Sequence, residues 1–71
     1  MYKYHINVFY SEDDEGYIAD VPDLKYCSAF GETTEDAVRE IMIAMELWIE
    51  VALEKDIEIP KPRYKPAIYA I

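Results

Sequence analysis

The sequence predicts an α+β fold in which a small antiparallel sheet carries one long helix on a single face. Three observations predict this class: period-two alternation over residues 2–10, two more short apolar runs within residues 17–30, and apolar residues at helical spacing from residue 34 to about residue 55. A last apolar run at 64–71 gives the element order β-β-β-α-β. Because 71 residues allow only a small core, we expect residues 1–71 to form a single domain.

The first two strands are predicted to form a hairpin. Alternation from Tyr2 to Tyr10 places five apolar side chains on one face, which we expect to be buried: Tyr2, Tyr4, Ile6, Val8 and Tyr10. The polar segment Ser11 to Gly16 is rich in carboxylates and ends in a glycine, which suits a hairpin loop. Tyr17 to Val21 is then the second strand.

A proline turn separates the second strand from the third. Pro22 presets its own φ and lacks an N–H donor, so Pro22-Asp23 favours a turn. Leu24 to Phe30 is the predicted third strand. Gly31 breaks this strand just before the helix begins.

The helix start has a specific local signal. Thr33 is the expected N-cap residue, and Asp36, three residues later, predicts a reciprocal capping box. Glu35 and Arg39 have the spacing of a helical ion pair. The helix is expected to run to about Lys55, with a core stripe formed by Val38, Ile41, Met42, Met45, Ile49 and Ala52.

The segment after the helix is expected to return to the sheet. Ile57 to Pro62 contains two prolines and is predicted to be an extended exit. Tyr64 to Ile71 is predicted to be a final strand, which Pro66 confines to a sheet edge because proline has no N–H to donate.

A second apolar flank of the helix predicts a contact surface. Ala44, Leu47, Trp48 and Val51 lie beside the core stripe, and contiguous exposed apolar patches usually mark interfaces. The alternative is that the C-terminal strand, or the segment before it, covers this flank within the same chain. If the flank is an interface, we expect a homo-oligomer, most simply a two-fold dimer that uses this flank or an exposed sheet edge.

The net charge limits the classes of partner and compartment. A charge of −8 repels nucleic acid, whose phosphates require cationic side chains, and it favours basic protein partners or simply keeps the domain soluble. A single cysteine, Cys27, cannot form an internal disulfide, and the start of the chain shows no signal peptide. Without an apolar run long enough to span a membrane, the chain is expected to be soluble and cytoplasmic.

The residues that carry chemistry do not form a catalytic, cofactor or metal pattern, so we expect no enzyme. His5 is the only histidine, which excludes a multi-histidine metal site and leaves no Ser-His-acid set. Cys27 is expected to pack within a strand. The carboxylates of Glu12 to Glu15 lack the ligand spacing of a calcium loop and are expected to be a solvated hairpin tip. Gly31 alone makes no phosphate-binding loop.

The motifs along nearly the whole chain resemble the signature of the HicB-like antitoxin family. The matching residues are Gly16, Tyr17, Ala19, Val21, Pro22, Asp23, Leu24 and Cys27, then Gly31, Glu32, Thr33, Glu35, Asp36 and Ala37, and finally Ile59, Pro60 and Pro62. Departures are Lys25-Tyr26, where the family usually has Pro-Gly, and Thr34 and Asp36 in the helix start.

This resemblance implies a partial ribonuclease-H-like fold without the catalytic carboxylates. It also implies binding to, and blocking of, a HicA toxin, a small ribonuclease that cleaves messenger RNA and uses a histidine. Full-length family members add a DNA-binding domain for which a chain ending at Ile71 leaves no room, so we expect no autorepression. Two functions therefore stand: an antitoxin-type module that masks a basic toxin, or a self-associating, non-catalytic structural or regulatory domain with another partner or none.

Overall fold

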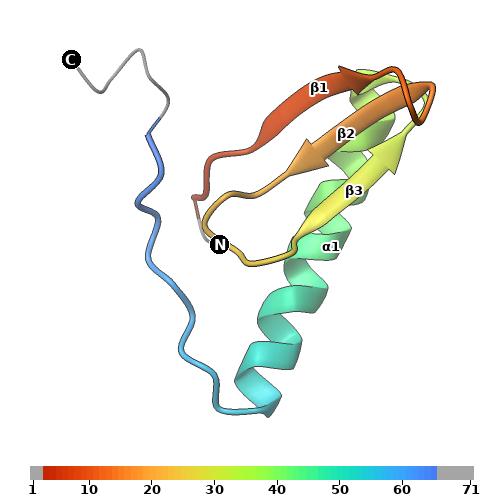
Figure 1. Ribbon diagram of the computed structural model, residues 1–71. Coiled ribbons are helices and arrows are strands. Elements are labelled where there is room, and N and C mark those ends of the chain that lie inside the picture. The colour runs from red at the N-terminus through yellow and green to blue at the C-terminus, as the bar shows by residue number, and fades with distance from the viewer. Residues whose placement is uncertain (1–2, 66–71) are drawn as a thin grey trace.

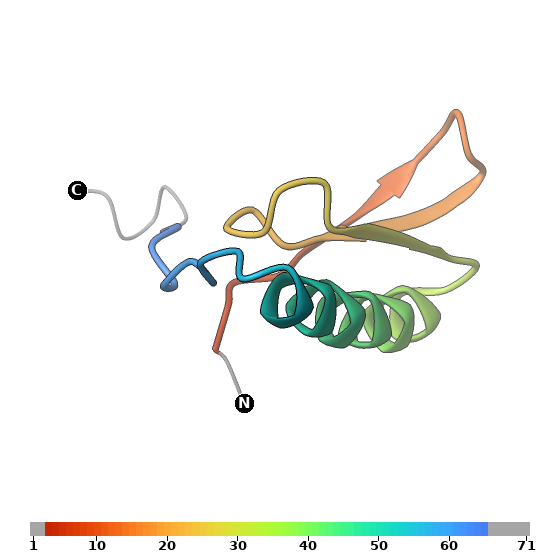
Figure 2. The same cartoon turned by 90° about the horizontal axis from the view of Figure 1, so that it is seen from below.

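A computed structural model describes residues 3–65 and confirms the α+β class. Strands β1 (Asn7–Ser11), β2 (Gly16–Asp20) and β3 (Ser28–Gly31) form an antiparallel sheet in the order β1-β2-β3. Helix α1 (Thr34–Glu54) packs on one face of this sheet, mainly against β3 and β2, with β1 at its margin (Figures 1 and 2). The opposite face of the sheet carries no second layer of described residues (Figure 2).

The predicted hairpin is present, but its first strand is shorter than expected. β1 pairs with β2 from Asn7 opposite Asp20 to Ser11 opposite Gly16, whereas the alternation predicted a strand from Tyr2. Residues 3–6 lie outside the ladder because Tyr4 turns into the core, where its hydroxyl donates a hydrogen bond to the carbonyl of Pro60. The contact with the exit segment thus takes the place of pairing with β2 at the start of the chain.

The third strand also begins later than predicted. It starts at Ser28, and residues 21–27 form two successive turns in place of the expected strand from Leu24. The Leu24 N–H donates to the Val21 carbonyl at 3.0 Å, and the Cys27 N–H donates to the Leu24 carbonyl at 3.1 Å. These turns direct Leu24 inward, where it is only 1% exposed, so core packing prevailed over the local strand pattern.

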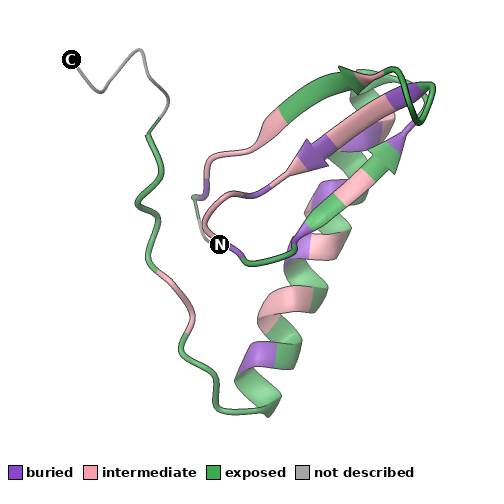
Figure 3. Ribbon diagram, viewed as in Figure 1, coloured by how far each residue is buried: buried purple, intermediate pink, exposed green. Residues whose placement is uncertain are grey.

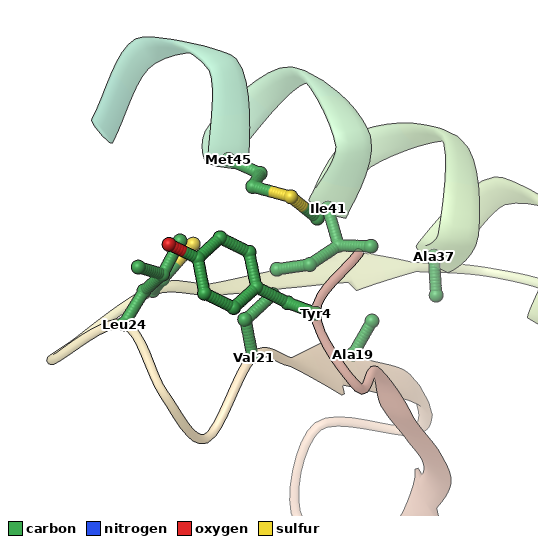
Figure 4. Packing of buried hydrophobic residues seen from close by; sticks show 8 residues of the cluster. Tyr4, Ala19, Val21, Leu24, Ala37, Ile41 and Met45 are labelled. Carbon is green, nitrogen blue, oxygen red and sulfur yellow. The ribbon is translucent and has the colours of Figure 1, made fainter. Parts of the chain in front are cut away.

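The core lies between α1 and the sheet and is closed by the loop between β2 and β3 (Figures 3 and 4). Ala37, Ile41 and Met45 point from the helix toward side chains from β2, the following loop and the start of the chain (Figure 4). The buried members of this core are Tyr4, Ala19, Val21, Leu24, Cys27, Ala37, Ile41 and Met45. Among the described residues the buried set contains no polar or charged side chain.

The buried stripe of the helix agrees with the predicted one except at its start: Ile41, Met45 and Ala52 are buried, and Met42 and Ile49 pack against the core. Ala37 is fully buried in the first turn, whereas Val38, which was predicted to belong to the stripe, is 40% exposed. The reason is the close approach of β3 to the first turn of α1: a Cβ added to Gly31 would lie 2.2 Å from the backbone nitrogen of Ala37. The first turn is therefore buried at Ala37 and not at Val38, and from Ile41 onward the buried residues belong to the predicted stripe.

Side-chain hydrogen bonds at the helix start are partly as expected. Thr33 is the N-cap residue in the structure, and its Oγ1 accepts a hydrogen bond from the Asp36 N–H at 3.1 Å. The Asp36 carboxylate pairs with Arg39 at 2.8 Å, so Arg39 pairs with Asp36 and not with Glu35 as the spacing predicted.

The helix end turns the chain back toward the sheet. Lys55 is the C-cap residue, and Asp56 adopts a left-handed conformation with φ of 54°. The Ile57 N–H then donates to the Ala52 carbonyl at 2.8 Å, which is the pattern of a Schellman motif. This motif starts the exit segment 57–65, seen as the blue extended trace in Figure 1.

The exit segment is held at its far end by the loop after β2. The Asp23 carboxylate accepts hydrogen bonds from the N–H groups of Arg63, at 3.0 Å, and Tyr64, at 3.1 Å. Tyr64 and Lys65 are not part of a strand, and the remainder of the predicted final strand, 66–71, lies outside the described residues.

Replacing the N-cap residue should measurably destabilise the protein. Thr33→Ala removes the hydroxyl that accepts from the Asp36 N–H, and we expect a loss of about 1 kcal/mol in the free energy of unfolding. In a domain of this size such a loss lowers the melting temperature by roughly 4–8 °C, which thermal denaturation followed by circular dichroism detects. Thr34→Ala is the matched control and should leave the melting temperature almost unchanged. Equal effects of the two substitutions would contradict this assignment of the cap.

Candidate protein-binding surfaces

An apolar groove lies between the C-terminal half of α1 and the start of β3. We call it the helix groove; its volume is about 420 Å³. Its lining is apolar apart from one serine and consists of Tyr26, Cys27, Ser28, Ala44, Leu47, Trp48, Val51, Ala52 and Ile57. The Schellman motif at the end of α1 positions Ile57 in this lining.

All four residues of the predicted apolar flank line the helix groove. Leu47 and Val51 are exposed, while Ala44 and Trp48 are half-buried and pack against the core. The four residues thus play two parts: Ala44 and Trp48 form the floor of the groove, and Leu47 and Val51 present apolar surface to solvent. The exit segment, which was the alternative cover for this flank, contributes only Ile57 among the described residues.

Trp48 fixes the turn that borders the groove. Its indole Nε1 donates a hydrogen bond to the Lys25 carbonyl at 3.0 Å, across 23 positions of the sequence. A half-buried tryptophan requires such a partner because its N–H would otherwise lose its hydrogen bond to water. The contact holds the loop between β2 and β3 against the helix, and it places Tyr26 at the rim of the groove.

Tyr26 is a groove residue that the sequence reasoning did not single out. It has φ of 62°, in the left-handed region that disfavours bulky side chains, and its side chain is 91% exposed. The signal was present in the sequence, since Lys25-Tyr26 is a departure from the Pro-Gly of the signature that the chain resembles. A strained backbone that presents a large aromatic side chain to solvent is typical of a functional surface.

The residues considered for chemistry have structural partners. His5 Nε2 lies 2.7 Å from the Asn7 side-chain oxygen, and its ring lies 4.7 Å from the ring of Tyr64. Cys27 is buried, and desolvation, followed by the negative charge of Asp20, raises the pKa of its thiol. A thiol with a raised pKa stays protonated at neutral pH and is a poor nucleophile.

The acidic hairpin tip is solvated. Glu12 to Glu15 are exposed, and Asp14 accepts a hydrogen bond from the Ser11 hydroxyl at 2.8 Å. Within residues 3–65 there is no group of three histidine, cysteine or carboxylate side chains placed to hold a metal ion. In the same part of the chain, no helix is long and apolar enough to cross a bilayer.

Comparison with known proteins identifies the family. Two UPF0150 proteins of Synechocystis sp. are each 38% identical to the chain, over 53 and 61 residues, which cover 75% and 86% of this chain and 73% and 76% of those proteins. A UPF0150 protein of Helicobacter pylori is 43% identical over 44 residues, covering 62% of this chain and 61% of that protein. No solved structure shows significant similarity. The profile described as "HicB_like antitoxin of bacterial toxin-antitoxin system" matches residues 4–68, and the chain therefore belongs to the HicB-like antitoxin family.

Proposed function

We propose that the protein is an antitoxin-type binding module that masks a small, basic, mRNA-cleaving toxin of the HicA kind. The observation that carries this proposal is the match to the antitoxin family across residues 4–68. Because such a toxin acts on messenger RNA, we place the pair in the cytoplasm.

The charge of the chain supports a basic protein as the partner. At −8, the protein attracts a cationic surface and speeds its approach, while it repels the phosphates of nucleic acid. A toxin that binds RNA needs a cationic surface for the same reason. An acidic protein that covers this surface would compete directly with RNA.

We propose that the protein inhibits by binding and has no hydrolytic activity of its own. His5, the one histidine of the chain, is engaged with Asn7, and the thiol of Cys27 is buried and protonated. The carboxylates of the hairpin tip are exposed and lack a converging geometry within the described residues. Masking requires only complementary surfaces and no catalytic groups.

We further propose that the protein forms a dimer through the helix groove. Leu47, Val51, Ile57 and Tyr26 expose apolar surface around the groove, and Tyr26 alone offers on the order of 200 Å². Patches of this kind on a small protein usually mark contact sites, and closed two-fold pairing is the commonest way to bury them. Dimerisation would also add stability to a chain whose own core is small.

The helix groove predicts a specific loss of self-association. Leu47→Glu combined with Val51→Glu places two charges on the apolar rim, and we expect a wild-type dimer and a monomeric double variant in light scattering at high micromolar concentration. Both side chains are exposed, at 56% and 43%, so the variant should remain folded by circular dichroism.

The helix supplies a matched control for this pair. Leu53 and Val38 are the same residue types with similar exposure, 63% and 40%, and neither lines the groove. Leu53→Glu combined with Val38→Glu should leave the dimer intact. A wild-type protein that is monomeric at this concentration would refute dimerisation, and a dimer retained in the groove variant would move the contact to a sheet edge.

Toxin neutralisation is tested by searching beside the gene for a small basic reading frame and co-expressing it with this protein. Expression of that neighbour alone should arrest growth, and expression of both proteins should restore growth and yield a complex on pull-down. The purified antitoxin-type protein alone should leave RNA intact, whereas the purified neighbour should cleave it.

The alternative function makes the opposite prediction in the same experiment. A self-associating domain without a toxin partner would neither rescue growth nor retain the neighbour on an affinity column, yet it would still form a dimer. RNA cleavage by the protein itself, lost on Asp13→Ala or Asp14→Ala, would overturn the non-catalytic assignment.

A further inference from the structure

The face of the sheet opposite the helix carries a continuous apolar row. Phe9 pairs directly with Ile18 across β1 and β2, and Ile18 pairs directly with Phe30 across β2 and β3. Direct cross-strand partners lie on the same face of a sheet. Ala19, the next residue along β2, is fully buried on the helix side, so the row faces away from α1.

This row departs from the usual pattern of a one-sided antiparallel sheet, in which the open face is polar. Phe9 and Phe30 are 50% and 44% exposed, and Ile18 is half-buried between them. The Phe30 ring lies over Gly16, where an added Cβ would be 2.4 Å from two ring carbons. Among the described residues, nothing covers this apolar row, which crosses all three strands.

The strands that carry the row, and the hairpin tip, bear only acidic charged groups. Asp20 pairs with Asn7 and Ser28 at one end of the row, and the exposed hairpin tip lies beyond the other end. Residues 7–20 and 28–32 contain no lysine, arginine or histidine, and the groups that are charged at neutral pH are the carboxylates of Glu12, Asp13, Asp14, Glu15, Asp20 and Glu32. An apolar centre with a single-sign rim is a surface that selects its partner by charge.

We infer that this outer sheet face is the docking surface for the basic protein partner, with Phe9, Ile18 and Phe30 as its apolar anchors and the surrounding carboxylates as its electrostatic rim. The inference rests on the proposed function and assigns its partner to one face. Aromatic side chains at the centre of a patch are the type that most often carries binding energy.

A second copy of the chain suits this face poorly. Stacking two such faces would bring both sets of carboxylates together, with no cation on either sheet to offset them. The helix groove differs in this respect, because Lys25 and Lys55 lie in the segments that border it. The two surfaces meet at Ser28, but the anchors Phe9, Ile18 and Phe30 do not line the groove, so a dimer joined through the groove can keep both outer sheet faces open.

Two neighbouring residues on β1 allow a sharp test. Phe9 and Tyr10 are similarly exposed aromatic residues, at 50% and 54%, but they lie on opposite faces of the sheet. Threonine keeps the strand propensity at both sites. The probe is a toxin of the HicA kind encoded beside the gene, with the histidine that such toxins use replaced by alanine so that it can be purified.

We expect Phe9→Thr to weaken binding of this probe at least about tenfold in calorimetry, and Phe9→Thr with Phe30→Thr to weaken it further. Tyr10→Thr and the groove variant Leu47→Glu with Val51→Glu should bind as wild type does. Binding should also weaken as salt rises, because the rim acts through exposed charges.

Three results would overturn the inference. Undiminished binding by folded Phe9→Thr with Phe30→Thr, together with loss of binding in the groove variant, would move the partner to the groove while leaving the proposed function intact. A change of oligomeric state in the sheet-face variant would make this face a contact between copies. Failure of the wild-type protein to bind the probe would overturn the proposed function together with this assignment.

Discussion

The contact between Gly31 of β3 and the first turn of α1 fixes how the helix sits on the sheet. Backbone meets backbone there, since a Cβ on Gly31 would lie 2.2 Å from the nitrogen of Ala37 and 2.6 Å from the carbonyl carbon of Asp36. The described glycines have no positive φ, so Gly31 is needed for space and not for its backbone conformation. This approach turns Ala37 and Ile41 inward and leaves Val38 outside.

Both proposed binding surfaces follow from this placement. With α1 held against β3, Trp48 reaches the Lys25 carbonyl and fixes the turn that carries Tyr26, which completes the rim of the helix groove. In the same placement α1 covers only one face of the sheet, so the row containing Phe9 and Phe30 stays exposed on the other face. This small fold thereby exposes two apolar surfaces: the helix groove, with Lys25 and Lys55 in the segments that border it, and the outer sheet face, whose strands carry only acidic charged groups.

The sequence was sufficient for the fold class, the hairpin, the helix and the four residues of the apolar flank, because each has a local pattern. The parts it did not predict depend on contacts between distant segments. Leu24 lies in a turn because the core needs its side chain, and Tyr4 leaves the strand pattern because it binds Pro60. The apolar row of Phe9, Ile18 and Phe30 could not be predicted from sequence periodicity either, because its alignment depends on the register of three strands.

The most direct test of this account is to fill the space at Gly31. Gly31→Ala keeps an allowed backbone conformation, and by itself the substitution would stabilise the chain by restricting the unfolded state. We predict instead a loss of about 2 kcal/mol or more in the free energy of unfolding, because the new methyl group meets backbone atoms that cannot move aside. Gly16→Ala is the control: its Cβ meets chiefly the outer end of the half-exposed Phe30 ring, which can swing away, so the loss should be much smaller. Denaturant unfolding of the two variants, measured side by side, would contradict the account if Gly31→Ala were as stable as wild type or no less stable than Gly16→Ala.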